Sequence, residues 1–185
     1  MRRIRLLVTV MVGLGLTAAT VLASTFLSAE FREVVSEAST IVRGRVTDVR
    51  AMRSTAGDVE SVVTIAVETA LKGSGETFVS MRVPGGTIGR YRTVMPGAPV
   101  MRVGEQAVFF LKRGPGNSLW PVGLAQGIYR VSSSGGPVRM VQAPVLPGVT
   151  TNAVGVVVRG DVRRKALPLA EFESLVRLLL TRGAQ

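Results

Sequence analysis

Residues 103–131, VGEQAVFFLKRGPGNSLWPVGLAQGIYRV, hold the densest strand-forming run of the chain, its only tryptophan and its clearest turns. Apolar residues fill every position of 107–111, which predicts a strand buried on both faces. The turn formers at 112–117 predict a loop after this strand. Residues 119–122 and 124–131, separated by a bend, predict further strands. We therefore expect a meander of at least three antiparallel strands.

The preceding part of the chain predicts a second group of three strands. Residues 40–52, 59–71 and 77–83 are rich in strand formers, and the middle one alternates between apolar and polar positions. Gly44 interrupts the first of them, which indicates a bulge or a tight bend such as a barrel corner. These strands are expected to form a first antiparallel meander.

Residues 84–99, PGGTIGRYRTVMPGAP, lie between the two groups and contain four Gly and three Pro. Such a composition excludes a central strand and predicts a long loop or an irregular crossover. Two meanders joined in this way are typical of a small closed barrel. The fold class expected is therefore mainly β, with a small OB-like antiparallel barrel. Apolar residues at helical spacing in 28–38 and 168–180 predict a helix at each end, packed on the barrel.

The amino terminus has the pattern of a signal peptide. A basic start, MRRIR, precedes an uncharged apolar run at 6–19, and VLA at 21–23 suits a signal peptidase. We expect cleavage after Ala23 and export to the periplasm or the extracellular space, with only transient membrane contact. An uncleaved anchor is the alternative, because residues 6–27 carry no charge.

The expected domain organisation follows from these boundaries. Residues 1–23 form the signal peptide, 24–141 the barrel with its first helix, and 142–185 an extended arm and a helix that docks on the barrel. Residues 154–158 within the arm could add an edge strand. The chain has no Cys, so its core alone must hold the exported domain together.

The net charge of +11 is concentrated in the middle of the chain, where Glu105 is the only acid between residues 77 and 139. One interpretation is a positive face that binds an anionic partner, either an exported protein or an anionic envelope polymer such as a glycan. The other is ordinary solvated surface charge. Nucleic acid is not expected as a partner of an exported protein, and the sequence does not specify the oligomeric state.

The residue inventory excludes most catalytic designs. Without His or Cys the chain has no histidine-dependent triad, cysteine nucleophile or thiolate metal site. The acids Asp58, Glu60, Glu68 and Glu76 lie at strand ends or beside turns, where solvated carboxylates are ordinary. We therefore expect no catalytic residue, no metal and no cofactor, and we expect that the protein is not an enzyme.

The candidate binding residues are Arg90, Tyr91 and Arg92 in the long loop, together with Trp120. Arginine next to an aromatic ring suits stacking and paired hydrogen bonds to carboxylate or phosphate. The alternative is a tyrosine packed on the barrel between two surface arginines. Trp120 and Tyr129 are either core residues of the meander or an aromatic platform for a ligand.

Spaced motifs between residues 31 and 131 form a recognisable pattern, IVRGRV at 41–46, LKG at 71–73, VPGG at 83–86, PGAP at 96–99, GE at 104–105, FFL at 109–111 and GLAQGIYRV at 123–131. This pattern resembles a family of uncharacterised exported bacterial proteins, which implies no particular activity. More distantly, it is similar to the netrin-like OB barrel of the tissue inhibitors of metalloproteinases. Those inhibitors bind the protease zinc through an N-terminal cysteine, which this chain lacks, so their mechanism does not transfer.

Two functional hypotheses follow from the sequence. The first is an exported, non-enzymatic binding module that recognises its partner through residues 84–99. The second is a regulator or inhibitor of an exported metalloprotease that acts without chelating zinc.

Overall fold

The computed structural model describes residues 31–73, 75–133, 138–144, 149–151, 157–159 and 166–183. The expected signal peptide, its cleavage site and the first residues of the expected N-terminal helix lie outside this part of the chain. Within the described part, no helix has both the length and the apolar character needed to cross a bilayer.

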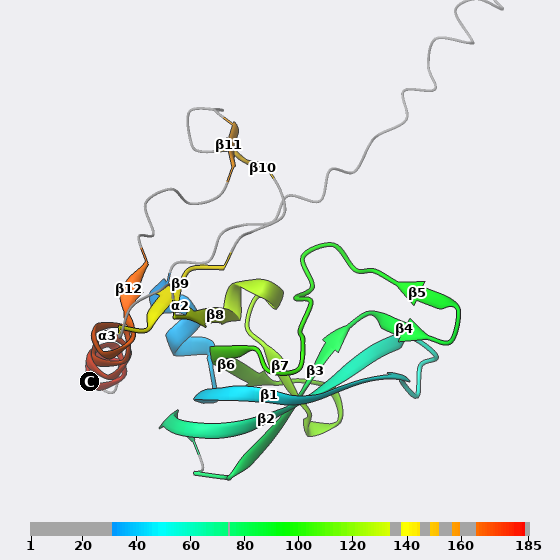
Figure 1. The fold of residues 1–185 in the computed structure, drawn as a ribbon, viewed down its shortest axis with the longest axis horizontal. Coiled ribbons are helices and arrows are strands. Elements are labelled where there is room, and N and C mark those ends of the chain that lie inside the picture. The colour runs from blue at the N-terminus through cyan, green and yellow to red at the C-terminus, as the bar shows by residue number, and fades with distance from the viewer. Residues whose placement is uncertain are drawn as a thin grey trace, which may run out of the picture.

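Five strands close into a barrel in the order β1-β2-β3-β7-β6, and β6 pairs back onto β1 (Figure 1). They are β1 (Thr40–Arg53), β2 (Val59–Lys72), β3 (Phe78–Pro84), β6 (Gln106–Arg113) and β7 (Leu119–Pro121). All neighbours are antiparallel except β3 and β7, which run parallel and complete the closure. The expected OB-like fold class is confirmed, and so is the first meander, β1-β2-β3.

Strand β6 is buried on both faces and separates two hydrophobic cores, as its unbroken apolar run predicts. Ala107, Phe109 and Leu111 point into the barrel, where they pack with residues of β1, β2 and β3. Val108 and Phe110 point outward into a second core, which lies between the barrel and the helices. We call it the helix-side core. Neither face of β6 meets solvent between Ala107 and Leu111.

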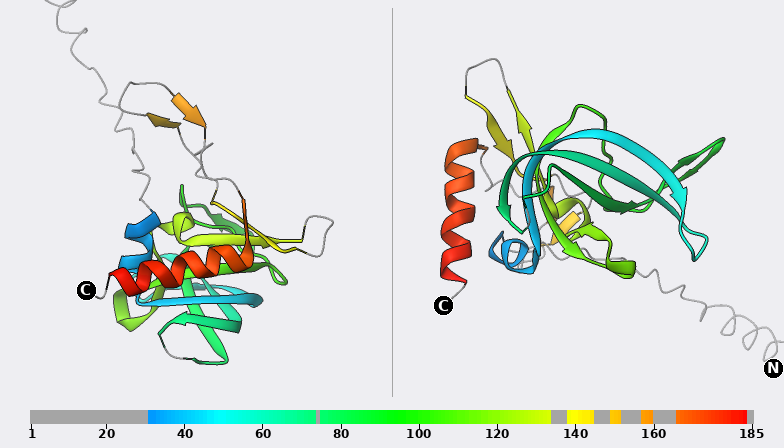
Figure 2. Two further views of the ribbon diagram at one scale, coloured as in Figure 1. Left: turned by 90° about the vertical axis from the view of Figure 1, so that its left-hand side faces the viewer. Right: turned by 90° about the horizontal axis from the view of Figure 1, so that it is seen from below.

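The second core is covered by two helices, α2 (Phe31–Glu37) and α3 (Leu169–Arg182), which lie side by side on one side of the barrel (Figure 2). Val34 of α2 and Phe172 and Val176 of α3 are buried there. Apolar residues at helical spacing therefore face the barrel in both helices. A helix at each end of the described barrel is confirmed.

The sheet continues beyond the barrel through β8 (Ile128–Ser132), β9 (Met140–Gln142) and β12 (Leu167–Pro168). Because β8 pairs with β6 rather than β7, the second group of strands is not a simple meander. The continuous strand expected at 124–131 is wrong in its first half. Residues Leu124–Gly127 form a 3-10 turn, η2, and Leu124 has φ 59°, which a strand does not allow.

Two further short elements join or lie apart from the main sheet. A 3-10 turn, η1 (Pro115–Asn117), joins β6 to β7. Strands β10 (Val149–Thr151) and β11 (Val157–Arg159) pair with each other in a separate sheet. Most of the edge strand expected at 154–158 lies outside the described residues, and the part that is described pairs with β10 rather than with the barrel.

The long crossover between β3 and β6 contains a hairpin, where the sequence predicted only a loop. Strands β4 (Gly86–Ile88) and β5 (Tyr91–Thr93) form a two-stranded sheet of their own. Figures 1 and 2 show this hairpin projecting from the end of the barrel that lies farthest from α3. A two-residue turn joins the strands directly, so strands of only three residues each can pair.

Candidate binding site

A cavity of about 400 Å³ lies between the β4–β5 hairpin and the end of the barrel. We call it the hairpin cavity. Its walls come from the ends of β1, β2 and β3 and from the chain that leads from β5 back toward β6. Its lining includes Ser61, Val83, Arg92, Val94, Met95 and Met101.

The base of the hairpin is held against the barrel by a close backbone approach. The buried Ser61 hydroxyl of β2 donates a hydrogen bond to the carbonyl oxygen of Gly85 at 2.8 Å. Gly86 has φ 152°, and a Cβ atom there would lie 2.6 Å from the Ser61 Oγ and 2.9 Å from the Ala51 Cβ. Only glycine allows this approach. The pair Gly85-Gly86 therefore forms the base of the hairpin.

Three of the four candidate residues share the hairpin. Arg90 lies in its turn, and its guanidinium donates a hydrogen bond of 2.7 Å to the Tyr91 hydroxyl and stacks over the tyrosine ring. Tyr91 is 60 % exposed, so it does not pack on the barrel as the alternative reading required. Arg92 lines the hairpin cavity and forms no ion pair with any described residue. These residues lie where a partner can reach them.

Trp120, the fourth candidate residue, lies elsewhere. It is on β7 opposite Lys112, and its ring packs over Gly114, where a Cβ atom would come within 2.3 Å of the Trp120 Cδ1. Its indole Nε1 is buried and has no hydrogen-bond partner among the described residues. Trp120 is not among the residues that line the hairpin cavity. Tyr129 is buried in the helix-side core, so the two aromatic residues form no exposed platform.

The stretch of chain that carries the hairpin has only positive charges. Residues 77–103 include four arginines and no carboxylate. The nearest acid along the chain, Glu105, is bound by the guanidinium of Arg130 and accepts a hydrogen bond from the backbone of Arg102. Among the described residues, neither Arg90 nor Arg92 forms an ion pair, so their charges remain available to an anionic partner.

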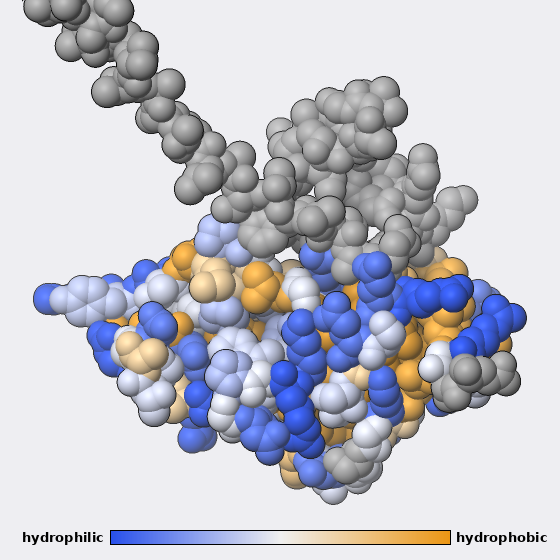
Figure 3. All heavy atoms as spheres, turned by 180° about the vertical axis from the view of Figure 1, so that it is seen from behind, coloured by the Kyte–Doolittle hydropathy of each residue, from blue (hydrophilic) through white to orange (hydrophobic). Residues whose placement is uncertain are grey.

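Exposed apolar side chains accompany these arginines, and sequence reasoning missed them. Val94 is 68 % exposed, and Met95, Val100 and Val103 are also exposed on the chain that follows β5. Figure 3 shows hydrophobic side chains among the hydrophilic ones on the side where the hairpin projects. The available signal was the TVM segment at 93–95, three residues without charge beside two arginines. Together they make the rim of the cavity both basic and apolar.

A second cavity, of about 390 Å³, lies between β2, β3 and the turn after β6. Its two arginines already have partners, since Arg82 pairs with Glu60 and Arg113 donates a hydrogen bond to Asn117. Arg92 in the hairpin cavity, by contrast, forms no ion pair with any described residue, so the hairpin cavity is the better candidate for binding an anionic group.

Two of the four carboxylates considered for catalysis are paired with other side chains. Glu60 pairs with Arg82, and Glu68 pairs with Arg43 and accepts hydrogen bonds from Gln106. Among the described residues, no group of three or more acidic side chains is placed to hold a metal ion.

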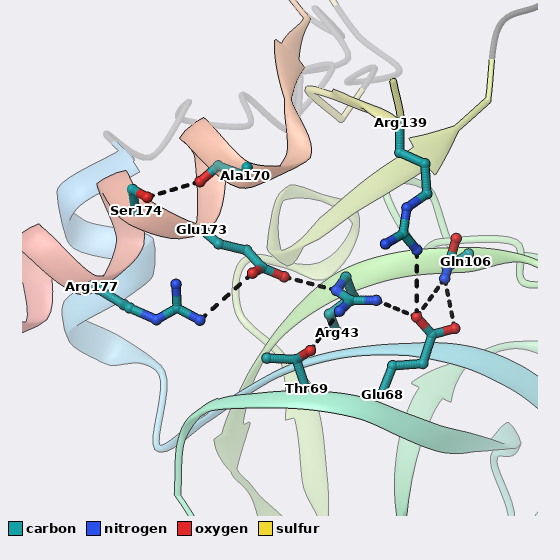
Figure 4. Close-up of polar contacts among 9 residues, drawn as sticks. All are labelled: Arg43, Glu68, Thr69, Gln106, Arg139, Ala170, Glu173, Ser174 and Arg177. Atoms are coloured by element: carbon teal, nitrogen blue, oxygen red, sulfur yellow. Dashed lines mark hydrogen bonds and ion pairs between the residues drawn. The ribbon is translucent and has the colours of Figure 1, made fainter. Parts of the chain in front are cut away.

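Arg43 on β1 joins the barrel to α3 (Figure 4). Its Nε donates to Glu173 of α3 at 2.7 Å, one Nη pairs with Glu68 and the other donates to Thr69 at 2.5 Å. Arg43 and Glu173 are each only 13 % exposed. Arg177 also approaches Glu173, at 3.6 Å, but from a largely exposed position. This cluster fixes α3 and does not face the hairpin cavity.

Arg43→Met is expected to lower the free energy of unfolding by about 2 kcal/mol. Removing one partner of a fully buried pair costs roughly 3–5 kcal/mol, and here each carboxylate keeps a second partner. Arg177→Ala is the matched control, because loss of an exposed pair costs about 0.5 kcal/mol or less. Thermal unfolding measures both variants. Equal effects would contradict the docking role of Arg43.

Comparison of the chain with known protein families found no match, and a search of curated proteins found none that is significantly similar. The fold and the site define the class as a small OB-like β-barrel with two docked helices and a hairpin-covered cavity. The resemblance to a family of exported bacterial proteins, and the more distant one to the metalloproteinase inhibitors, stay predictions.

Proposed function

We propose that the protein is an exported, non-enzymatic binding module that recognises a protein or an anionic envelope polymer at the β4–β5 hairpin. The hairpin cavity is the observation that carries the proposal. It is a concave site of about 400 Å³, within the range typical of ligand pockets, and Arg92 and exposed apolar side chains line it or its rim.

The composition of the rim supports recognition rather than chemistry. Protein-binding surfaces combine apolar contact area with arginine and tyrosine, and Arg90, Tyr91 and Arg92 supply both residue types. Val94 and Met95 add apolar area directly after them. Export is part of the proposal because of the signal-peptide pattern at residues 1–23.

Affinity capture from the native exported fraction tests this proposal, with the chain from Ser24 onward as bait. A partner bound by the unaltered chain is expected to be reduced at least about tenfold by Arg90→Ala/Arg92→Ala, since residues at the centre of an interface contribute more than about 1 kcal/mol each. Trp120→Phe is the control, because Trp120 does not line the cavity. It should leave capture unchanged.

Two outcomes would contradict the proposed site. Capture that is unaffected by the double arginine variant would show that the hairpin is not the binding surface. Capture lost with Trp120→Phe, in a variant that remains folded, would move the site to β7. An exported metalloprotease in the captured fraction, together with inhibition of its activity, would favour the regulatory hypothesis instead.

A further inference from the structure

The outer edge of β5 is an open strand edge. β4 lies against β1 and β2, whereas β5 pairs with β4 alone among the strands of the described residues, and all three of its residues are exposed. Figure 1 shows β5 on the side of the hairpin that faces away from the barrel. An exposed edge carries unpaired backbone donors and acceptors and is a template for another strand.

The register of the hairpin identifies which backbone groups are free. Ile88 and Tyr91 close the two-residue turn, Thr87 faces Arg92, and Gly86 faces Thr93. A closing pair of this kind is hydrogen-bonded, and hydrogen-bonded and non-hydrogen-bonded pairs alternate along an antiparallel ladder. Arg92 therefore belongs to a non-hydrogen-bonded pair. Its N–H and C=O point away from β4, toward the open edge.

The charges and apolar side chains near this edge indicate which kind of strand would fit it. Arg92 lies on β5 and Arg90 in the turn before it, and residues 77–103 contain no acid. Val94 and Met95 line the hairpin cavity and are exposed, so aliphatic side chains of a partner can be buried there. Acidic and aliphatic residues at alternate positions of an extended segment satisfy both requirements.

We propose that β5 binds an extended acidic segment of a partner protein as an added strand, held by the backbone of Arg92. This inference rests on the proposed function and narrows it to one kind of partner. A peptide is favoured over an anionic polymer because the cavity walls contain apolar residues such as Val83 and Met101, and a polymer held by charge uses neither these residues nor the strand edge.

The test uses a labelled heptapeptide of alternating valine and glutamate, with fluorescence anisotropy as the readout. Arg92→Gln removes the charge but keeps the backbone N–H, and binding should weaken about fivefold, as for loss of one exposed ion pair. Arg92→Pro also removes the N–H and should weaken binding about tenfold further, as for loss of a hydrogen bond. A lysine-for-glutamate peptide should not bind.

Peptide backbone variants make the test independent of how Arg92→Pro folds. One peptide carries N-methyl groups on its odd-numbered residues and another on its even-numbered residues. Because alternate N–H groups of a strand face opposite edges, only one of the two should lose binding. Equal binding by both would overturn the added-strand proposal.

Further outcomes separate this inference from the proposed function. If no glutamate peptide binds while dextran sulfate binds the unaltered chain in a salt-sensitive way that Arg90→Ala/Arg92→Ala abolishes, the hairpin is a polyanion site and the peptide inference is wrong. If neither probe binds and the capture from the exported fraction is also unaffected by the arginine variant, both proposals fail.

Discussion

Phe110→Ala is expected to lower the free energy of unfolding by about 4 kcal/mol, because truncating a buried phenylalanine costs roughly 3–5 kcal/mol. Phe110 is fully buried in the helix-side core. Its ring lies edge-on to three others, with centroid distances of 5.7 Å to Phe31, 5.3 Å to Tyr129 and 6.3 Å to Phe172. A loss of this size is a large fraction of the 5–15 kcal/mol that holds an ordinary domain together.

The position of Phe110 also predicts where the structure loosens first. Its ring joins Phe31 of α2 to Phe172 of α3, so the cavity left by alanine lies between the helices and the barrel. Hydrogen exchange should therefore accelerate more in α3 than in β3, which borders only the barrel interior.

A matched control comes from the same substitution at a surface position. Phe78 is 57 % exposed at the start of β3, so Phe78→Ala is expected to change the free energy of unfolding by about 0.5 kcal/mol or less. Denaturant unfolding compares the two variants. A loss below about 1 kcal/mol for Phe110→Ala would show that the helices are not held by this aromatic cluster.

The pattern of β6 shows why the barrel could be predicted from the sequence. Five consecutive apolar residues, Ala107 to Leu111, leave no polar face, so the strand had to lie between two hydrophobic layers. The alternation in β2 likewise fixed which of its faces meets the barrel interior. Such patterns predict burial directly, because positions that are buried in a strand are occupied by apolar side chains.

The details that depended on backbone conformation or on distant contacts were not predictable in the same way. The 3-10 turn at Leu124–Gly127 consists of residues that also suit a strand, and the positive φ of Leu124 has no sequence signature. The parallel pairing of β3 with β7 rests on residues 38 positions apart, Met81 and Leu119. Tertiary contacts decided both features.

Part of the geometry around the candidate residues could be predicted from the sequence. A loop rich in Gly and Pro with an Arg-Tyr-Arg sequence was a reasonable place for binding residues, and the structure places all three on one hairpin. The cavity beneath them depends on Ser61 and on the ends of β1 to β3, which come from other parts of the chain. Trp120 lies on β7 outside this cavity, and its sequence neighbours could not distinguish an exposed platform from the half-buried packing position that it occupies.

Gly44→Ala is expected to lower the free energy of unfolding by about 3 kcal/mol, near the upper end of the usual 1–3 kcal/mol cost of overpacking. Gly44 lies on β1 between its two partners, opposite Val67 of β2 and Ala107 of β6. A Cβ atom there would lie 2.3 Å from the carbonyl oxygen of Ala66 and 2.6 Å from the Ile65 Cγ2. The oxygen belongs to the backbone, so β1 and β2 would have to separate.

This crowding follows from the irregularity that the sequence predicted at Gly44. The register of β1 on β2 shifts between Arg43 and Gly44, which confirms a bulge or irregularity at this point. At this point β1 pairs with β2 and β6 at the same time, and the β2 backbone lies close to the Gly44 Cα. A methyl group at this position therefore acts against closure of the barrel itself, and not only against one contact.

Gly75→Ala is the matched control, because a Cβ atom at Gly75 meets nothing within 4 Å and its φ is not in the left-handed region. This substitution should be neutral or slightly stabilising, since alanine restricts the unfolded chain. Calorimetry measures the melting temperatures of both variants. A melting temperature for Gly44→Ala equal to that of Gly75→Ala would show that β1 and β2 can separate at the bulge without cost, and that closure of the barrel does not depend on the glycine.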